Sequence, residues 1–232
     1  MKLGFFTDSH YSSQEVTCGN RYNNQSLRKI RQAYEAFAAA KCDLVISLGD
    51  LIDKEHDHAK ETENLRQVAQ LINSFPIPSI CLMGNHDAFC LTVEEFYEIL
   101  GQQNAPQNRI VDGKQLVFLD ACYFKSGQHY QPGDEDWTDT FYPFETQLEE
   151  TIAGYHGESI VFVHQNLDPS VMENHCLFNA AKIRNILESS GKVKHVFQGH
   201  YHEGNEAQVN GIQYTTFPAM CQRENAYFIV EL

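Results

Sequence analysis

Five short apolar segments of this sequence each end in a cluster of histidine, aspartate or asparagine. Such segments have the length and composition of buried β-strands. The clusters, in chain order, are Asp8-Ser9-His10, Gly49-Asp50-Leu51-Ile52-Asp53, Gly84-Asn85-His86-Asp87, His164 and Gly199-His200-Tyr201-His202. Because the carboxyl ends of strands in open α/β sheets converge on one crevice, these side chains are expected to meet. The pattern therefore predicts a metal site.

Between these segments the apolar residues follow a helical period. Strands are expected over 2–7, 43–48, 78–83, 159–163 and 193–198, with a hairpin over 109–120. Helices are expected from Ser26, over 59–74, from Thr92, over 143–154 and over 179–190, with Ser26, Thr92 and Asn179 as N-caps and Gly191 as a stop signal. The C-terminal part alternates like antiparallel strands around Asn210-Gly211. This order predicts an α/β fold with one mixed sheet, or two sheets between helices.

The length favours one domain. The chain has 232 residues, of which 42% are apolar, and no linker-like boundary divides it. We therefore expect a single domain over 1–232. The segment 121–142 is irregular and holds six aromatic residues. Long irregular loops are usually functional or disordered, and the aromatic content favours a binding lid.

The net charge of the chain limits the classes of partner that it can bind. With 17 basic and 31 acidic residues, the net charge is −14. This disfavours nucleic-acid polymers and anionic membranes, which are bound by clustered Lys and Arg. We see no apolar stretch long enough for a membrane span and no signal-peptide core. No two of the seven cysteines form a CxxC motif, and we expect all of them to be reduced thiols. Reduced thiols favour a cytoplasmic location.

The number of candidate ligands indicates the kind of metal site. Seven side chains qualify: Asp8, His10, Asp50, Asn85, His164, His200 and His202. One tetrahedral zinc needs at most four ligands, whereas seven fit two metals that share a bridging carboxylate. The nitrogen and oxygen donors suit manganese, iron, zinc or nickel and exclude a cysteine-type structural zinc.

In this order, the motifs Asp-x-His, Gly-Asp, Gly-Asn-His-Asp, His and Gly-His-x-His resemble the calcineurin-like metallophosphoesterase superfamily, from residue 5 to residue 202. The resemblance implies the metallo-dependent phosphatase fold, a four-layer αββα sandwich with two mixed β-sheets. It implies a first metal held by Asp8, His10 and His202, a second held by Asn85, His164 and His200, and Asp50 as the bridge. Two divalent ions are expected, manganese first, with iron, zinc or nickel as alternatives.

The resemblance also implies an activity. It is the hydrolysis of a small phosphorylated molecule (a phosphodiester, a phosphomonoester or a nucleoside diphosphate derivative) by a hydroxide that bridges the metals. His86 would be the general acid, and Asp53 would orient it. Arg21 is a candidate phosphate clamp. Tyr123 and Asp87 are further candidates for substrate binding, with Asp87 also a candidate to support the metal ligands from behind.

Differences from known branches of this superfamily reduce the number of substrate classes to consider. Asp53 stands where purple acid phosphatases have tyrosine, and Lys54-Glu55-His56 replaces the Asp-Arg-Gly of protein phosphatases. Small cyclic-nucleotide phosphodiesterases and nucleoside-diphosphate hydrolases remain, and the stretch 21–28 is weakly similar to manganese-dependent ADP-ribose pyrophosphatases. The alternative is a non-catalytic scaffold or binding protein on the same fold, although no predicted ligand is missing. A metallo-β-lactamase fold would need a His-x-His-x-Asp-His run, which is absent. The sequence leaves the oligomeric state open.

Overall fold

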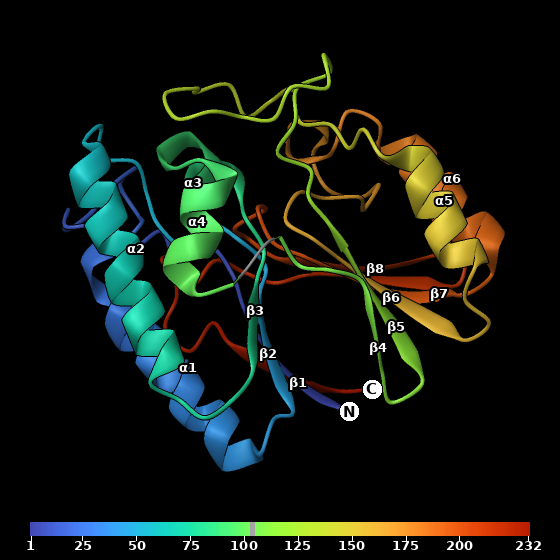
Figure 1. The fold of residues 1–232 in the computed structure, drawn as a ribbon, viewed down its shortest axis with the longest axis horizontal. Helices are drawn as coiled ribbons and strands as arrows, with labels where there is room; N and C mark the ends of the chain where they lie inside the picture. The colour runs from blue at the N-terminus through green and yellow to red at the C-terminus, as the bar shows by residue number, and fades with distance from the viewer. Residues whose placement is uncertain (103–104) are drawn as a thin grey trace.

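The computed structural model describes residues 1–102 and 105–232. Two mixed sheets lie face to face, and helices cover the outer face of each (Figure 1). This is the αββα arrangement that the resemblance implied, and of the two possibilities left by the strand order it is the one with two sheets. The termini lie side by side, and the Met1 amino group donates a hydrogen bond to the Leu232 carbonyl oxygen at 3.0 Å.

The first sheet has the order β10-β1-β2-β3. Its strands are β1 (Lys2–Phe6), β2 (Leu44–Ser47), β3 (Ser79–Cys81) and β10 (Phe228–Glu231). The first three are parallel, and β10 is antiparallel to β1. The helical segments on this side are η1 (Asn23–Gln25), α1 (Ser26–Ala40), α2 (His58–Asn73), α3 (Asn85–Cys90) and α4 (Val93–Leu100).

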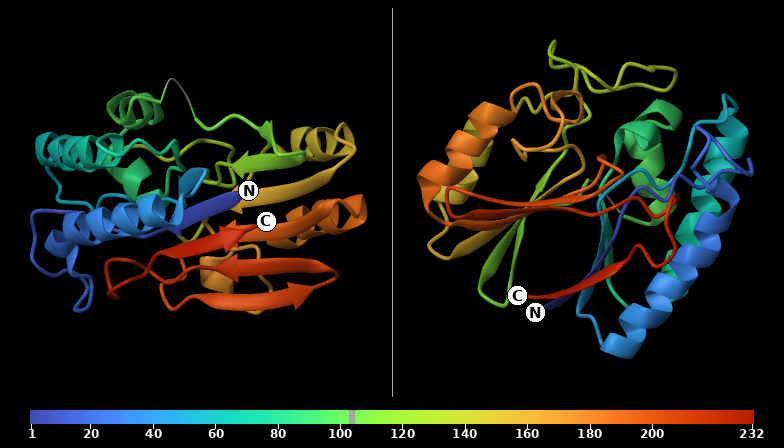
Figure 2. Two further views of the ribbon diagram at one scale, coloured as in Figure 1. Left: turned by 90° about the horizontal axis from the view of Figure 1, so that it is seen from below. Right: turned by 180° about the vertical axis from the view of Figure 1, so that it is seen from behind.

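The second sheet has the order β4-β5-β6-β7-β9-β8. Its strands are β4 (Arg109–Val111), β5 (Lys114–Leu119), β6 (Glu158–Val163), β7 (Val193–Gln198), β8 (Asn205–Val209) and β9 (Ile212–Thr216). Its helical segments are α5 (Glu145–Ala153), η2 (Glu173–His175) and α6 (Ala180–Ser190). In Figure 2 the two groups of helices lie on opposite sides of the paired sheets.

The C-terminal strands differ partly from the prediction. The β8–β9 hairpin turns at Asn210-Gly211 as predicted, and both residues have the positive φ of such a turn. However, β9 pairs in parallel with β7, and β10 crosses to the other sheet. The local alternation identified strands correctly but carried no information about their distant partners.

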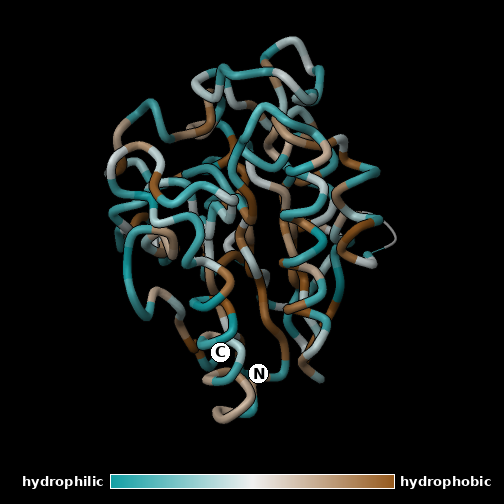
Figure 3. Tube along the Cα trace, turned by 90° about the vertical axis from the view of Figure 1, so that its left-hand side faces the viewer, coloured by the Kyte–Doolittle hydropathy of each residue, from teal (hydrophilic) through white to brown (hydrophobic). Residues whose placement is uncertain are grey.

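Aromatic and aliphatic side chains fill the space between the sheets. Figure 3 shows hydrophobic strands at the centre and a hydrophilic exterior. The Phe5 ring lies 4.7 Å from that of Phe197 and 5.0 Å from that of Phe217, measured between centroids. Burial of such side chains contributes roughly 1.5–3 kcal/mol each. This core fixes the strands whose ends carry the polar clusters.

Of the four predicted signals for helix ends, Ser26 is wrong as an N-cap, and Asn179 occupies the N-cap position of α6 without a capping hydrogen bond. Thr92 forms the predicted capping box with Glu95, and Gly191 ends α6 with a φ of 65°. Ser26 is the first residue of α1, and its hydroxyl donates to the Ser9 carbonyl oxygen. The Asn179 side chain donates to the Tyr142 carbonyl oxygen instead of capping α6. Tertiary partners have taken over both side chains.

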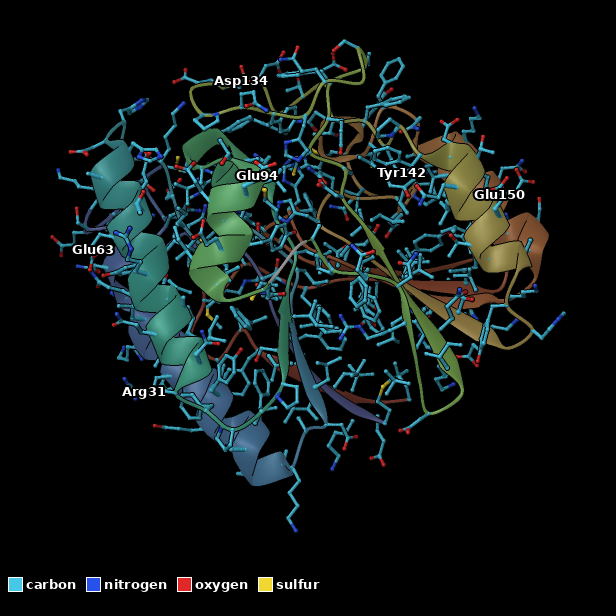
Figure 4. The ribbon with its side chains drawn as sticks, viewed as in Figure 1. Arg31, Glu63, Glu94, Asp134, Tyr142 and Glu150 are labelled. Atoms are coloured by element: carbon cyan, nitrogen blue, oxygen red, sulfur yellow. The ribbon has the colours of Figure 1, made fainter. Side chains whose placement is uncertain are left out.

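All seven cysteines carry free thiols, as predicted, although Cys18 is exposed. Within the described residues, no helix has the length and apolarity that crossing a membrane requires. The segment 120–144 joins β5 to α5 without helix or strand, and the structure describes all of it. Its part around Asp134 passes above α3 in Figure 4, on the side where β1, β2, β6 and β7 end.

Candidate metal centre

All seven predicted ligands meet at one place, at the carboxyl ends of the strands. Asp8 and His10 follow β1, and Asp50 follows β2. Asn85 is the first residue of α3, the helix that follows β3 after three residues. The last three follow β6 and β7: His164, His200 and His202. Six of the seven are buried, and His202 is partly exposed.

The ligands predicted for the first metal form a compact group. The Nε2 atoms of His10 and His202 lie 3.2 Å apart. His202 Nε2 lies 3.3 Å from Asp8 Oδ1, and His10 Nε2 lies 3.7 Å from the same oxygen. Ligand atoms around an ion at about 2.1 Å are separated by about 3.0–3.4 Å, so the group has the size of a coordination shell.

The second group has similar spacing. His164 Nε2 lies 3.2 Å from Asn85 Oδ1. His200 joins it, since ligand atoms of Asp50, His164 and His200 all lie within 4.8 Å of one another. The other ring nitrogen of His164 lies 2.8 Å from the Leu48 carbonyl oxygen, which orients the ring and leaves Nε2 facing the group.

Asp50 stands between the two groups. Its Oδ2 lies 3.5 Å from His10 Nε2 and 3.3 Å from His164 Nε2. Its other oxygen accepts a hydrogen bond from the His86 backbone amide at 2.9 Å. One oxygen is therefore fixed by the backbone while the other faces both groups, which is the position required of a bridging carboxylate.

Several buried polar atoms of the site have no hydrogen-bond partner. They include Asp8 Oδ1 and His200 Nε2. Asp8 Oδ2 is satisfied, since it accepts from Thr7 Oγ1 and from the His200 backbone amide. A buried polar group without a partner is costly. Coordination of a cation would satisfy both atoms, so the donor set fits a metal site.

The motif glycines allow this close packing. A Cβ at Gly84 would lie 2.2 Å from Asp50 Oδ1, and one at Gly199 would lie 2.2 Å from Thr7 Oγ1 and 2.8 Å from Asp8 Oδ2. At both positions the backbone passes directly behind a predicted ligand. Glycine is therefore needed here for space.

The carboxylates give the site a negative electrostatic potential. Burial and Arg21 would lower the pKa of His10, but nearby carboxylates raise it to about 9. Burial would also lower the pKa of His164, which Asp50 raises to about 9. Burial would raise the pKa of Asp50, but the neighbouring histidines, His164 foremost, hold it well below its usual range. Such a potential attracts cations.

His86 and Asp53 form a pair beside the ligands. His86 Nδ1 lies 2.7 Å from Asp53 Oδ1. The other Asp53 oxygen accepts from Thr17 Oγ1 and Asn23 Nδ2, both at 2.9 Å. Asp53 is thus held on one side and holds the His86 ring on the other. Burial lowers the pKa of His86 despite the nearby carboxylates.

Arg21 lies beside the His86–Asp53 pair. Its Nη1 lies 3.5 Å from His86 Nε2 and 3.6 Å from Asp53 Oδ1. The loop that carries it is tied to the site, because the Asn23 side chain also donates to the His10 carbonyl oxygen at 2.7 Å. The guanidinium lines the pocket, where it can meet an anionic substrate.

Two expected substrate-binding residues lie elsewhere. The fully buried Asp87 accepts hydrogen bonds from the backbone amides of Ile52 and Gly84 at 3.1 and 2.9 Å, so it braces the turns that carry the ligands. Tyr123 packs against His129 and does not line the pocket. The position of Asp87 fits its predicted role behind the ligands and rules out substrate contact, whereas the role of Tyr123 stays a prediction.

A pocket of about 340 Å³ opens onto the site. Predicted residues that line it are Arg21, Asp50, Asn85, His86, His200 and His202. Residues that sequence reasoning did not assign to the site are Trp137, Met172, His175, Tyr201 and Glu203. Trp137 belongs to the predicted lid, and the aromatic content of that loop was the signal that could have singled it out.

The two-sheet αββα sandwich and the buried histidines and carboxylates at its strand ends fit a metal-dependent hydrolase of phosphate esters, the class to which the sequence family assigns the chain. The chain belongs to the calcineurin-like phosphoesterase family, whose model matches residues 1–204. It is 25% identical over 231 residues to 3′,5′-cyclic adenosine monophosphate phosphodiesterase CpdA of Haemophilus influenzae, an alignment that covers 95% of this chain and 77% of that protein.

Solved structures support the fold. A dimetal phosphatase from Danio rerio is similar with a TM-score of 0.81 and 16% identity, over 95% of this chain and 88% of that one. The phosphopantetheinyl hydrolase PptH of Mycobacterium tuberculosis is similar with a TM-score of 0.59 and 11% identity, over 99% and 95% of the two chains. At these identities the likeness concerns the fold.

Proposed function

We propose that this protein is a dinuclear metal-dependent phosphoesterase that hydrolyses a small phosphorylated molecule. The observation that carries the proposal is the position of Asp50 Oδ2, within 3.5 Å of both histidine-containing groups. A single mononuclear site would leave one of these groups without a purpose. The name of the Haemophilus relative supports phosphodiesters as substrates.

The proposed ligand sets are Asp8, His10 and His202 for one ion, Asn85, His164 and His200 for the other, and Asp50 for both. Two divalent ions held there would neutralise phosphate oxygens and lower the pKa of a bound water. We further propose manganese as the metal, a single domain over 1–232 and a cytoplasmic location. The net charge of −14 argues against polyanionic partners, whereas the ions would concentrate positive charge in one pocket.

The protein's own residues complete the reaction. His86 lines the pocket, and its Nδ1 is held by Asp53, so Nε2 is the nitrogen left for a substrate. From this position the ring can donate a proton to the leaving oxygen. The carboxylate of Asp53 keeps the ring oriented and partly opposes the burial that lowers the pKa of His86. Arg21, beside His86, binds a substrate phosphate oxygen.

The test uses metal-stripped protein supplied with Mn²⁺ and a panel of bis-p-nitrophenyl phosphate, cyclic nucleotides, nucleoside diphosphate derivatives and simple monoesters. Hydrolysis that depends on the metal is expected with at least one of them. Asp50→Asn should lose activity by about 10²-fold or more, because the bridge serves both ions. Absence of metal-dependent hydrolysis across the panel would favour the non-catalytic scaffold.

His86→Ala tests the assignment of the acid. Metal content should match the parent protein, while turnover falls by about 10²–10⁴-fold, the usual contribution of general acid catalysis. Loss of metal in this variant would show that His86 is a ligand instead. Phe178→Leu, at an exposed position outside the pocket, is the control and should leave both quantities unchanged.

A further inference from the structure

His202 is the most exposed of the predicted metal ligands. Its side chain is 15% exposed, whereas that of Asp8 is fully buried. It lies between β7 and β8, in a segment without helix or strand. Because its Nε2 faces Asp8 Oδ1 at 3.3 Å, a partner at Nδ1 decides both how the ring is oriented and which nitrogen carries the proton.

That partner is the side chain of Gln222. Its amide nitrogen lies 2.8 Å from His202 Nδ1 and 3.3 Å from Asn20 Oδ1. The oxygen and nitrogen of a side-chain amide exchange places when the group rotates by half a turn, so either atom can occupy the position beside Nδ1. Gln222 does not line the pocket, so this contact supports the ring without occupying the space of a substrate.

The turn that carries Gln222 is tied to the first ligand group. The backbone amide of Cys221 donates a hydrogen bond to the Asp8 carbonyl oxygen at 3.0 Å. From α1, the buried Lys29 ammonium group donates to the Cys221 carbonyl oxygen at 3.1 Å. A buried ammonium group requires such partners, so this contact fixes the turn to the helix. Gln222 is thus held beside His202 by the same backbone that contacts Asp8.

The two orientations of the Gln222 amide have opposite consequences for metal binding. If the amide nitrogen donates to Nδ1, the proton of the neutral His202 ring lies on Nε2, which then cannot bind a metal. If the amide oxygen accepts from the Nδ1–H group, Nε2 keeps its lone pair. We propose that Gln222 is a positioning residue that accepts this hydrogen bond and so directs His202 Nε2 to the metal proposed beside Asp8. The inference rests on the proposed function and adds a supporting residue to its metal centre.

Binding of Mn²⁺ to chelator-treated protein, measured by electron paramagnetic resonance of the free ion, tests this role. Gln222→Leu removes the acceptor at similar side-chain size, so one class of Mn²⁺ site should weaken by about 10–100-fold. Gln222→Glu keeps an oxygen acceptor and should bind Mn²⁺ at least as tightly as the parent. The control Gln208→Leu, the same substitution at an exposed position of β8, should bind like the parent. Parent-like binding in Gln222→Leu, or an equal loss in Gln222→Glu, would overturn the inference.

The position of the proton on His202 gives a measurement that does not require metal. In isotope-labelled, metal-free protein at about pH 8, where imidazole is neutral, the nitrogen chemical shifts should place the proton on Nδ1. His202→Gln identifies the resonances by their loss. In Gln222→Leu the preference for Nδ1 should be reduced, because the acceptor is gone. A proton on Nε2 in the parent, or an unchanged preference in Gln222→Leu, would contradict the proposal.

Failure of this inference is distinguishable from failure of the proposed function. Mn²⁺-dependent hydrolysis of bis-p-nitrophenyl phosphate is measured on the same preparation of the parent protein. If the parent hydrolyses it but Gln222→Leu binds Mn²⁺ like the parent, only the role of Gln222 is refuted. If the His202 proton lies on Nδ1 and depends on Gln222 but no phosphoester is hydrolysed, only the catalytic proposal is refuted.

Discussion

Gly84→Ala is a sharp test of the bridging role of Asp50. Gly84 has a φ of −98° and a ψ of 175°, which alanine adopts without strain, so the substitution adds only a methyl group. That Cβ would lie 2.2 Å from Asp50 Oδ1 and 2.4 Å from the Asp50 backbone nitrogen. To restore contacts of 3.0 Å, the carboxylate oxygen must move by about 0.8 Å and the Asp50 backbone nitrogen by about 0.6 Å.

A displacement of this size is expected to lower the catalytic rate by a predictable factor. Misplacement of a reacting group by about 1 Å reduces the rate by about 10²-fold, which corresponds to about 2.7 kcal/mol in activation free energy. We therefore expect kcat for bis-p-nitrophenyl phosphate with Mn²⁺ to fall by roughly 30–100-fold in Gly84→Ala. Weaker binding of the metals, measured by calorimetry, should accompany this loss, because Asp50 faces both ligand groups.

The control is Gly154→Ala at the end of α5. Gly154 has a φ of −69°, and its Cβ would meet no atom closer than 3.2 Å. This variant should keep the parent kcat and metal affinity. Thermal unfolding followed by circular dichroism separates a local from a global effect. If folded Gly84→Ala retains the parent kcat and metal affinity, Asp50 does not act as the bridge.

Three further outcomes are expected. Asp53→Asn should lower kcat by about 10–100-fold with unchanged metal content by mass spectrometry, since it orients His86 without being a predicted ligand; a loss of metal would contradict that role. Addition of Mn²⁺ at about 100 times its dissociation constant should raise the melting temperature of chelator-treated protein by roughly 5–10 °C, and no shift would argue against a metal site in the folded state. The third outcome concerns His129, whose pKa burial would lower but the hydrogen bond and charge of Asp120 raise. The pair therefore stabilises the fold fully below the unfolded pKa of 6.5, and this contribution is lost as pH rises through the higher folded pKa. In urea unfolding, His129→Gln should lose less stability than the parent over that range, and identical profiles would refute this assignment.

The meeting of the candidate ligand side chains could be predicted from the sequence because its signals are local. Each motif directly follows an apolar strand, and parallel strands bring their carboxyl ends to one edge. Asp8, Asp50 and His164 therefore lie close together although long segments separate them in the chain. Nothing more than the strand assignment was needed to predict this meeting.

The roles of neighbouring aspartates were harder to predict. Asp53 and Asp87 each lie within a few residues of a ligand; the family resemblance gave Asp53 one role, but it left two for Asp87. The turn geometry decides: Asp53 faces His86, whereas the Asp87 carboxylate turns back onto backbone amides. Trp137 was missed for a related reason, because an irregular loop has no periodicity from which side-chain direction follows.

The backbone at the site gives a physical reason why the ligand positions are so well defined. Four predicted ligands have left-handed φ angles, namely Asp8, His10, Asp50 and His200. For residues other than glycine this conformation costs of order 1–3 kcal/mol each, so the surrounding structure must impose it. The amides of Asp8 and His10 donate to the carbonyl oxygens of Gly49 and Asp50 at 3.0 and 2.9 Å, which ties the β1 turn to the β2 turn.

This arrangement has a consequence for metal binding. Backbone hydrogen bonds and the close approach of Gly84 and Gly199 hold the predicted ligands in position. The conformational entropy lost in fixing these side chains is compensated during folding, by burial of the core between the sheets. Binding energy from the proposed metals would then be available for affinity, and the same packing makes the site intolerant of added volume behind Asp8 or Asp50. Substitution of a motif glycine is therefore expected to impair the centre while leaving the fold intact.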